Sequence, residues 1–282
     1  MKGKIMRLRF TAGITALLCA GSICLAQTAP TAADEKGLWE IWKMQQEKPE
    51  EYANLSTNCL EFVKKNPKDP LSIVAMTMAS WYLLKLDNKE AAAKLLRTVE
   101  TPLKTDGLNT SASNMAKTWL SRLDLEQVRN ALQLYYRQKI EYPKTLDLIK
   151  PFQKNGQPPL ADRFGKPWVY GLAEFKNLKK LGTLYAMYGQ QYTIKSASLG
   201  TNSELKAAIK IPYSSGIPLK PVKMISGTPG KEMVQLESTD GKQTKVVMSI
   251  GTDNGGISLN YVGPKLLILS DMNHWLILPR PY

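Results

Sequence analysis

The hydrophobic pattern of this chain changes its period near Tyr142–Pro143, and that change limits what the chain can fold into. Before it, from Leu38 onward, apolar residues recur every three or four positions, which indicates amphipathic helices. After it, apolar residues fall into short runs bounded by Gly, Pro, Asn and Asp, a pattern typical of strands joined by turns. With 282 residues to distribute, this order predicts a multi-domain α+β protein.

Residues 1–26 have the composition of a secretory signal peptide. A basic start from Lys2 to Arg9 leads into the apolar run TAGITALLCAGSICLA, and the polar run QTAPTAADEKG follows. The apolar run is shorter than the roughly 20 residues that a membrane-spanning helix needs. We therefore expect cleavage after Ala26, a linker over residues 27–37, and a mature chain that is periplasmic or extracellular.

Two other fates of this N-terminal segment stay open. An uncleaved signal would anchor the chain in the inner membrane, and this is the one membrane contact that we expect. A lipid-modified Cys24 is disfavoured, because Ile23 is too bulky for the position before such a cysteine. Cleavage leaves Cys59 as the one cysteine of the mature chain, so no internal disulfide can form, and we expect Cys59 to be a buried apolar residue.

Residues 38–123 are predicted to form a helical domain. Pro67 and Pro102 stand at nearly the same phase of two windows, 34–67 and 68–101, and each window holds two helical segments. Small and large side chains in the second window are spaced in a way that resembles tetratricopeptide repeats, at Ala75, Trp81, Leu84, Ala91, Ala92 and Leu96. The resemblance implies an array of helical hairpins with a concave groove for a partner. The alternative is an ordinary helical bundle.

Residues 124–203 carry a second resemblance. A helical segment over 125–140 leads into Tyr-Pro, then into Asp-x-x-Gly-x-Pro-Trp-x-Tyr, and then into a strand. This order resembles the globular part of the major pseudopilins of type II secretion, and the matching residues are Tyr136, Tyr142, Pro143, Leu146, Asp162, Gly165, Pro167, Trp168, Tyr170, Tyr192, Ser196 and Gly200. The resemblance implies a pseudopilin-like α+β module with strands at WVYGL and QYTIKSASL.

Two features of that family have no counterpart in this sequence. The pseudopilin processing site is missing, so the resemblance does not imply a fibre subunit. The acidic calcium loop is replaced by LGTNSELKAAIK, in which Glu204 is the one acidic residue. Because calcium needs several oxygen ligands, calcium binding is not implied, and we expect no metal and no cofactor.

Residues 204–282 are predicted to form an all-β domain. Six short apolar segments alternate with turn sequences, at 222–226, 232–238, 244–251, 256–262, 265–270 and 274–279. Such regular spacing indicates a small antiparallel barrel or sandwich. The last two segments are almost wholly apolar, so we expect them to be central strands.

The positive charge of the chain is concentrated in its middle. Residues 123–200 carry 12 basic and 6 acidic side chains, a net of +6, against +14 for the whole chain. In a secreted protein such a surface suits an acidic protein or an anionic wall polymer, whereas nucleic acid is not expected in that compartment. A solvated basic surface without a dedicated partner is the simpler alternative.

The sequence offers no catalytic residue. His274 is the single histidine, and we interpret it as a turn residue beside the core residue Trp275 rather than as a base or a zinc ligand. The glycine-rich run GTDNGGIS lies between two predicted strands, so it predicts a hairpin turn rather than a phosphate-binding loop. An enzyme is therefore not expected, with a hydrolase as the remaining alternative.

Together these features predict a non-enzymatic binding or scaffold protein of the cell envelope, beside a type II secretion or type IV pilus-like system, with an envelope protein as partner. A cell-wall or polysaccharide-binding protein is the alternative. The candidate partner-binding residues lie at and just after the first strand of the middle module, at Trp168, Tyr170, Lys176, Lys179 and Lys180.

Overall fold

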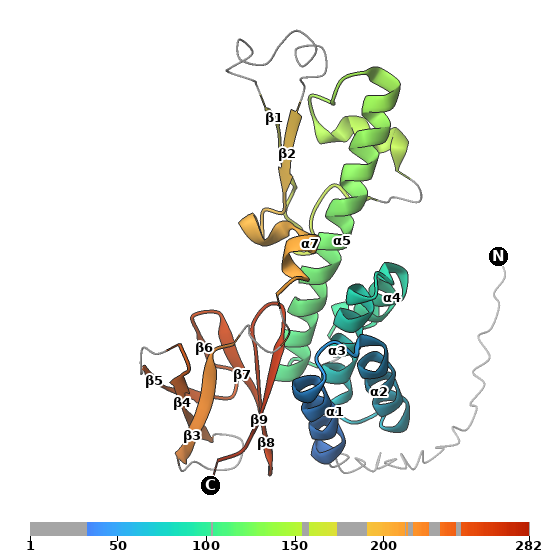
Figure 1. Ribbon diagram of the computed structural model, residues 1–282. Coiled ribbons are helices and arrows are strands. Elements are labelled where there is room, and N and C mark those ends of the chain that lie inside the picture. The colour runs from blue at the N-terminus through green and yellow to red at the C-terminus, as the bar shows by residue number, and fades with distance from the viewer. Residues whose placement is uncertain are drawn as a thin grey trace, which may run out of the picture. The chain divides into compact units, whose positions relative to one another are not determined.

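Four helices form the first part of the structure, a computed structural model (Figure 1). They are α1 (Glu35–Glu47), α2 (Tyr52–Lys65), α3 (Ser72–Lys85) and α4 (Lys89–Glu100), and each packs against the next. The described residues are 33–102, 104–153, 158–173, 191–211, 213, 217–225, 232–240 and 244–281. The predicted signal peptide, its cleavage site and most of the predicted linker lie outside these ranges.

Side-chain caps account for where two of these helices begin. The carboxylate of Asp34 accepts a hydrogen bond from the backbone N–H of Gly37 at the start of α1, and the amide oxygen of Asn88 accepts one from Ala91 at the start of α4. Each bond satisfies a backbone donor that the first turn of a helix cannot pair internally. Asp69 accepts a bond from the N–H of Leu71, and α3 begins at the next residue.

The fifth helix, α5 (Gly107–Lys139), is one continuous helix of 33 residues. The sequence predicted two helices that meet near Leu123–Asp124, but neither residue breaks a helix. Asp124 is buried, and its carboxylate receives the guanidinium of Arg163 at 2.5 Å, so a charged side chain is tolerated inside the helix. The helix ends at Ile140, which has a left-handed backbone with φ 59°.

Two strands pack beside the second half of α5. Strands β1 (Val169–Ala173) and β2 (Gln191–Lys195) pair antiparallel, with Val169 opposite Lys195, at the two places where the sequence predicted strands. A 3₁₀ helix, η1 (Leu146–Phe152), precedes them, and η3 (Gly200–Ser203) and α7 (Leu205–Ala208) follow.

Two antiparallel sheets make up the C-terminal part. One has the order β3-β4-β5 and the other β6-β7-β8-β9. Each of the six predicted segments overlaps a strand, and the strand bounds are β3 (Leu219–Ile225), β4 (Met233–Ser238), β5 (Lys245–Ser249), β7 (Ile257–Val262), β8 (Leu266–Ser270) and β9 (Trp275–Pro279). The two-residue β6 (Asp253–Asn254) lies within the run that was predicted to be a hairpin turn. The described strands do not close into a barrel.

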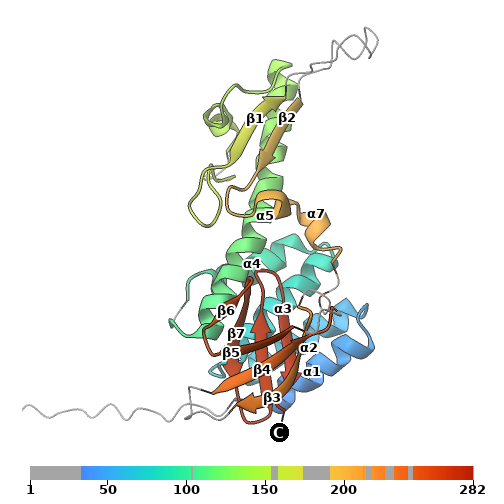
Figure 2. The ribbon, with the colours of Figure 1, turned by 90° about the vertical axis from the view of Figure 1, so that its left-hand side faces the viewer.

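The α+β class predicted from the sequence is confirmed by this mixture of helices and antiparallel sheets. The buried side chains fall into two clusters. The proximal core joins α1–α4 and the first half of α5 to α7, Tyr213 and the two C-terminal sheets. The distal core joins the second half of α5, from Leu125 to Leu132, to Ile149, Trp168 and Ile194. Figure 2 shows α5 running between the two regions.

The two cores divide the chain differently from the three predicted modules. The helical segment and the β segment, 38–123 and 204–282, were expected to be separate domains, but their buried residues belong to one cluster. The middle segment, 124–203, has the distal core to itself.

Candidate functional site

The helices that were expected to offer a concave groove contact the chain's own sheet instead. The carboxylate of Glu35 on α1 accepts hydrogen bonds from the Tyr261 hydroxyl and from the N–H of Lys265, both at 2.8 Å. On α3, the hydroxyl of Thr77 accepts a bond from the indole N–H of Trp275 at 2.5 Å.

The fifth helix contributes to the same contact. The Ser111 hydroxyl lies 2.6 Å from the amide oxygen of Asn260, and the indole N–H of Trp119 donates to the carbonyl of Asn273. Helices α1, α3 and α5 therefore all present their inner sides to the segment from Asn260 to Trp275. A groove on that side is therefore filled by the chain's own sheet.

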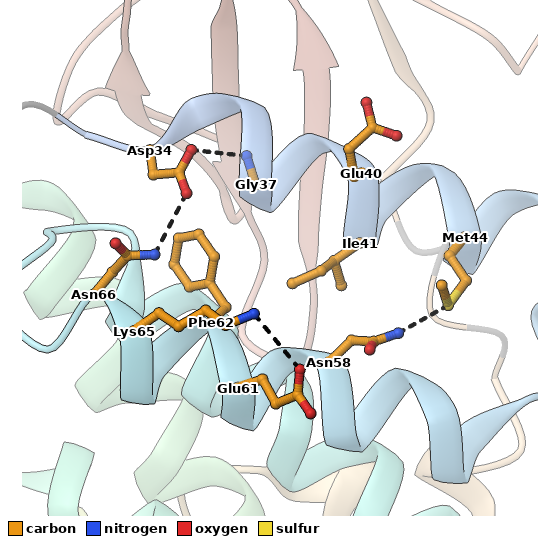
Figure 3. Close-up of a pocket in the computed structure, with 10 residues that line it drawn as sticks. All are labelled: Asp34, Gly37, Glu40, Ile41, Met44, Asn58, Glu61, Phe62, Lys65 and Asn66. Atoms are coloured by element: carbon orange, nitrogen blue, oxygen red, sulfur yellow. Dashed lines mark hydrogen bonds and ion pairs between the residues drawn. The ribbon is translucent and has the colours of Figure 1, made fainter.

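A shallow hollow lies between α1 and α2, on a side that the sheet does not cover (Figure 3). Its volume is about 310 Å³. Its apolar side chains are Ile41, Met44 and Phe62, and its other lining residues are Asp34, Gly37, Glu40, Asn58, Glu61, Lys65 and Asn66.

The polar side chains of the hollow are partly engaged with one another. Asn58 donates to the sulfur of Met44 at 3.2 Å, and Asn66 donates to Asp34 at 3.4 Å. The ammonium of Lys65 lies 3.8 Å from the carboxylate of Glu61, and in Figure 3 the carboxylate of Glu40 points away from this pair. The hollow therefore has an apolar floor and a polar rim in which Lys65 pairs with one of the acidic side chains.

A second group of polar side chains is buried where α3 and α5 meet the turn between β8 and β9. The ring of His274 lies 5.1 Å from the Tyr213 ring, and the Trp81 and Trp119 rings lie beside it. Its Nδ1 is 3.6 Å from a carboxylate oxygen of Asp271, which is too long for a direct hydrogen bond. Within the described residues neither ring nitrogen has a hydrogen-bond partner.

Asp271 and Arg122 are the charged side chains of this buried group. Burial alone would raise the pKa of Asp271, but the interaction with His274 and bonds from the backbone N–H groups of Asn273 and His274 lower it below its ordinary value. Burial lowers the pKa of Arg122 to about 10, although the negative charge of Asp271 acts in the opposite direction and raises it. The guanidinium stacks over Trp119 at 4.4 Å and donates to Asn273.

This buried group agrees with the interpretation of His274 as a residue beside a core tryptophan, because both side chains are buried. No sequence pattern indicated that Arg122 would be buried with it. Among the described residues, no group of three or more His, Cys, Asp or Glu side chains could hold a metal ion. Cys59 is a buried free thiol, and burial raises its pKa.

The predicted partner-binding residues are placed as follows. The side chain of Trp168 is 5% exposed and its indole N–H donates to the carbonyl of Pro159 at 2.8 Å. The Tyr170 hydroxyl donates to the carbonyl of Pro143 at 2.7 Å, and burial raises its pKa to about 12. Both rings therefore belong to the distal core and its rim. The lysines at 176, 179 and 180 lie outside the described residues.

The turn before Trp168 is held by a single buried carboxylate. Asp162 accepts hydrogen bonds from the N–H groups of Phe164 and Lys166, from the Ser196 hydroxyl at 2.7 Å and from the N–H of Ser198. Gly165 takes a left-handed backbone, φ 81°, which a residue with a side chain would adopt only with strain. Asp162 and Gly165 are both among the residues that match the pseudopilin pattern, but that match did not predict that Asp162 would tie the turn to the end of β2.

Comparison with known proteins adds no relative. No protein-family model matches this chain. A search of curated proteins finds no match, and no solved structure matches it either. Within the described ranges no helix is both long enough and apolar enough to cross a membrane.

Proposed function

We propose that this chain is a non-enzymatic binding or scaffold protein of the cell envelope, acting in the periplasm or outside the cell beside a type II secretion or type IV pilus-like system. Its partner in this proposal is an envelope protein. The finer architecture that goes with it is a helical hairpin array, a pseudopilin-like middle unit and two C-terminal sheets that form an open sandwich.

The observation that carries the proposal is the construction of the distal core. The second half of α5 packs against a two-stranded hairpin, and the turn that enters β1 is fixed by Asp162 and Gly165. Tyr136 stacks on Tyr142 at 4.7 Å, and Tyr142 meets Tyr192 at 4.6 Å. The residues on which the pseudopilin resemblance rests therefore contact one another across the unit, which supports a shared fold.

The surfaces open to a partner are those that the C-terminal sheets do not cover. Since the sheet fills the inner side of α1, α3 and α5, the hollow between α1 and α2 and the surface of the distal region remain. The distal region exposes apolar side chains, among them Ile140 at 79% exposure beside the basic residues Arg137 and Lys139. An exposed apolar side chain next to two cations suits an acidic protein surface.

A capture experiment tests the proposal. The mature chain is immobilised and exposed to cross-linked envelope extract of the source organism, together with the variants Ile140→Asp and Leu86→Asp. Leu86 is 46% exposed at the end of α3, so it is the matched control for an exposed aliphatic side chain after a helix. We expect a secretion or pilus component with the wild type and the control, and at least a several-fold loss with Ile140→Asp.

Failure to enrich any secretion or pilus component would contradict the proposal. Pelleting with purified peptidoglycan in a salt-sensitive manner would instead favour the wall-polymer alternative. That alternative relied on Trp168, Tyr170 and the lysines at 176, 179 and 180. The two rings are engaged in the distal core and its rim, and the three lysines lie outside the described residues.

A further inference from the structure

The C-terminal sheets have four edge strands, and three of them are poorly suited to pairing with another chain. Strand β3 contains Pro221, and its register shifts between Pro221 and Lys223. Strand β6 has two residues. Strand β9, which the sequence predicted to be central, is an edge strand; it buries its first three residues and ends at Pro279. Prolines, irregular register, shortness and coverage are the devices that keep sheet edges from pairing.

Strand β5 has none of these protections. Its five residues, KVVMS, contain no proline, and its pairing with β4 has an unbroken register from Glu237–Lys245 to Met233–Ser249. The side chain of Val247 is 52% exposed, the highest value among the large apolar residues of the two sheets. In the part of the chain that the structure describes, no strand pairs with the other side of β5.

The backbone groups on that open side can be assigned from one hydrogen bond between β4 and the residue before β5. The N–H of Ser238 donates to the carbonyl of Thr244, so the backbone of Thr244 points toward β4, and Val246 and Met248 follow by the alternation of a strand. Lys245, Val247 and Ser249 therefore point away from β4. The backbone groups of Ser249 are not open to another chain, because its N–H and its carbonyl both bond to Thr252.

The open edge thus presents the N–H and C=O groups of two residues, Lys245 and Val247. We propose that this edge pairs with the β5 edge of a second copy of the chain, antiparallel, with Lys245 of each copy opposite Val247 of the other. Each facing pair then exchanges two N–H···O bonds, so four hydrogen bonds join the copies and every open backbone group is used.

The charges and side chains of β5 favour a second copy as the occupant. In this register Lys245 faces a valine rather than the other lysine, so no like charges oppose each other directly. The carboxylate-bearing neighbour in the same sheet is Glu237, which lies opposite Lys245 on β4. Val246 of one copy faces Val246 of the other, and β-branched pairs of this kind stabilise neighbouring strands. The edge is short, so the dimer is expected to be weak and to depend on concentration.

The test is the mass of the mature chain in solution, measured by sedimentation equilibrium up to about 1 mM. Val247→Pro removes the N–H that the dimer needs; that N–H makes no bond within its own sheet, so the variant is expected to fold. Val247→Lys keeps the N–H and adds a charge at the edge. The matched control is Val222→Lys, at a valine that is 40% exposed on the proline-bearing edge strand β3.

We expect the wild type and Val222→Lys to dimerise, and both Val247 variants to dimerise at least ten-fold more weakly. Amide hydrogen exchange adds a site-specific readout, because the Lys245 and Val247 amides should become slower to exchange as the protein concentration rises. A wild type that stays monomeric over the whole range, or dimers that survive both Val247 substitutions, would overturn the proposal. Should Val247→Pro fail to fold, Val247→Lys and the exchange data decide.

Discussion

The proximal and distal cores are built on the same helix, yet they depend on contacts of different range. In the proximal core, α5 meets residues about 150 positions away: Ser111 bonds to Asn260, and Arg122 to Asn273. In the distal core, the indole of Trp168 bonds to Pro159, nine positions away, and the longest link from Asp162 is to Ser198, 36 positions away. The comparison suggests that the proximal core unfolds as one body and that the distal core can open alone.

The largest effect is expected at Trp275. Its ring is buried in the proximal core and its N–H bonds to Thr77, so Trp275→Ala removes a large buried side chain together with that hydrogen bond. We expect a loss of about 4 kcal/mol in the free energy of unfolding. Hydrogen exchange should speed up in the helices and in both C-terminal sheets, and faster exchange confined to β9 would show that the proximal core is not one body.

The next effect is expected at Trp168, in the distal core. Trp168→Ala should cost about 3 kcal/mol, because the ring is buried against the second half of α5. Here we expect faster exchange only within residues 125–195, with α1–α4 unchanged. An equal loss of exchange protection in α1–α4 would contradict the independence of the two cores. A variant that is as stable as the wild type but no longer captures the partner would show that Trp168 is a binding residue.

A smaller effect, with a pH dependence, is expected at Asp162. Burial would raise its pKa, but bonds from Ser196, Lys166 and Ser198 lower it. The carboxylate therefore contributes stability that is complete above the pKa of an unfolded aspartate, about 3.9, and is lost as the pH falls through the lower folded pKa. Asp162→Asn should cost about 2 kcal/mol at pH 7 and little at pH 2.

The measurement for Asp162 is urea unfolding of the wild type and the variant between pH 2 and pH 7, followed through exchange of the β1 and β2 amides. Asp147→Asn serves as the control, since Asp147 is exposed and forms an ion pair with the exposed Lys150. A cost that does not change with pH would mean that the charge of Asp162 is not what holds the turn.

The smallest effect is expected to be a gain. Ile140 and Asp87 are the two described residues other than glycine with positive φ, 59° and 57°. Aspartate tolerates this conformation, whereas a β-branched side chain does so only with strain. Ile140→Gly should raise stability by about 0.5–1 kcal/mol, and Asp87→Gly should change it little. A denaturation midpoint that falls in Ile140→Gly would show that the exposed side chain makes a stabilising contact.

Much of the secondary structure could be predicted because its signals are local. The periodic apolar residues predicted the helices, and the six C-terminal segments each overlap a strand. The continuity of α5 was missed because Asp124 was taken as an interruption; its neutralisation by Arg163 comes from a residue 39 positions away. The sequence also did not predict that the helices and the C-terminal sheets share one core. No local pattern indicates which distant part of the chain covers an apolar face.

The candidate sites were less predictable than the fold. The aromatic residues predicted as partner contacts, Trp168 and Tyr170, are engaged in the distal core and its rim. A core this small needs large rings to fill it. The hollow between α1 and α2 is lined largely by ordinary polar helix residues, which carry no distinguishing sequence pattern. The open edge of β5 was hidden as well, since sequence alone does not give the order of strands in a sheet.

The long-range contacts of the proximal core also mean that its helices are synthesised well before the strands that cover them. Trp119 is made 154 residues before Asn273, the residue to which it bonds. At about 5–20 residues per second, ribosomal synthesis leaves these helices without their covering sheet for about 8 to 30 s. During that interval the inner sides of α1, α3 and α5 are exposed apolar surface, a suitable substrate for a chaperone, and a chain truncated before β8 would retain that exposure permanently.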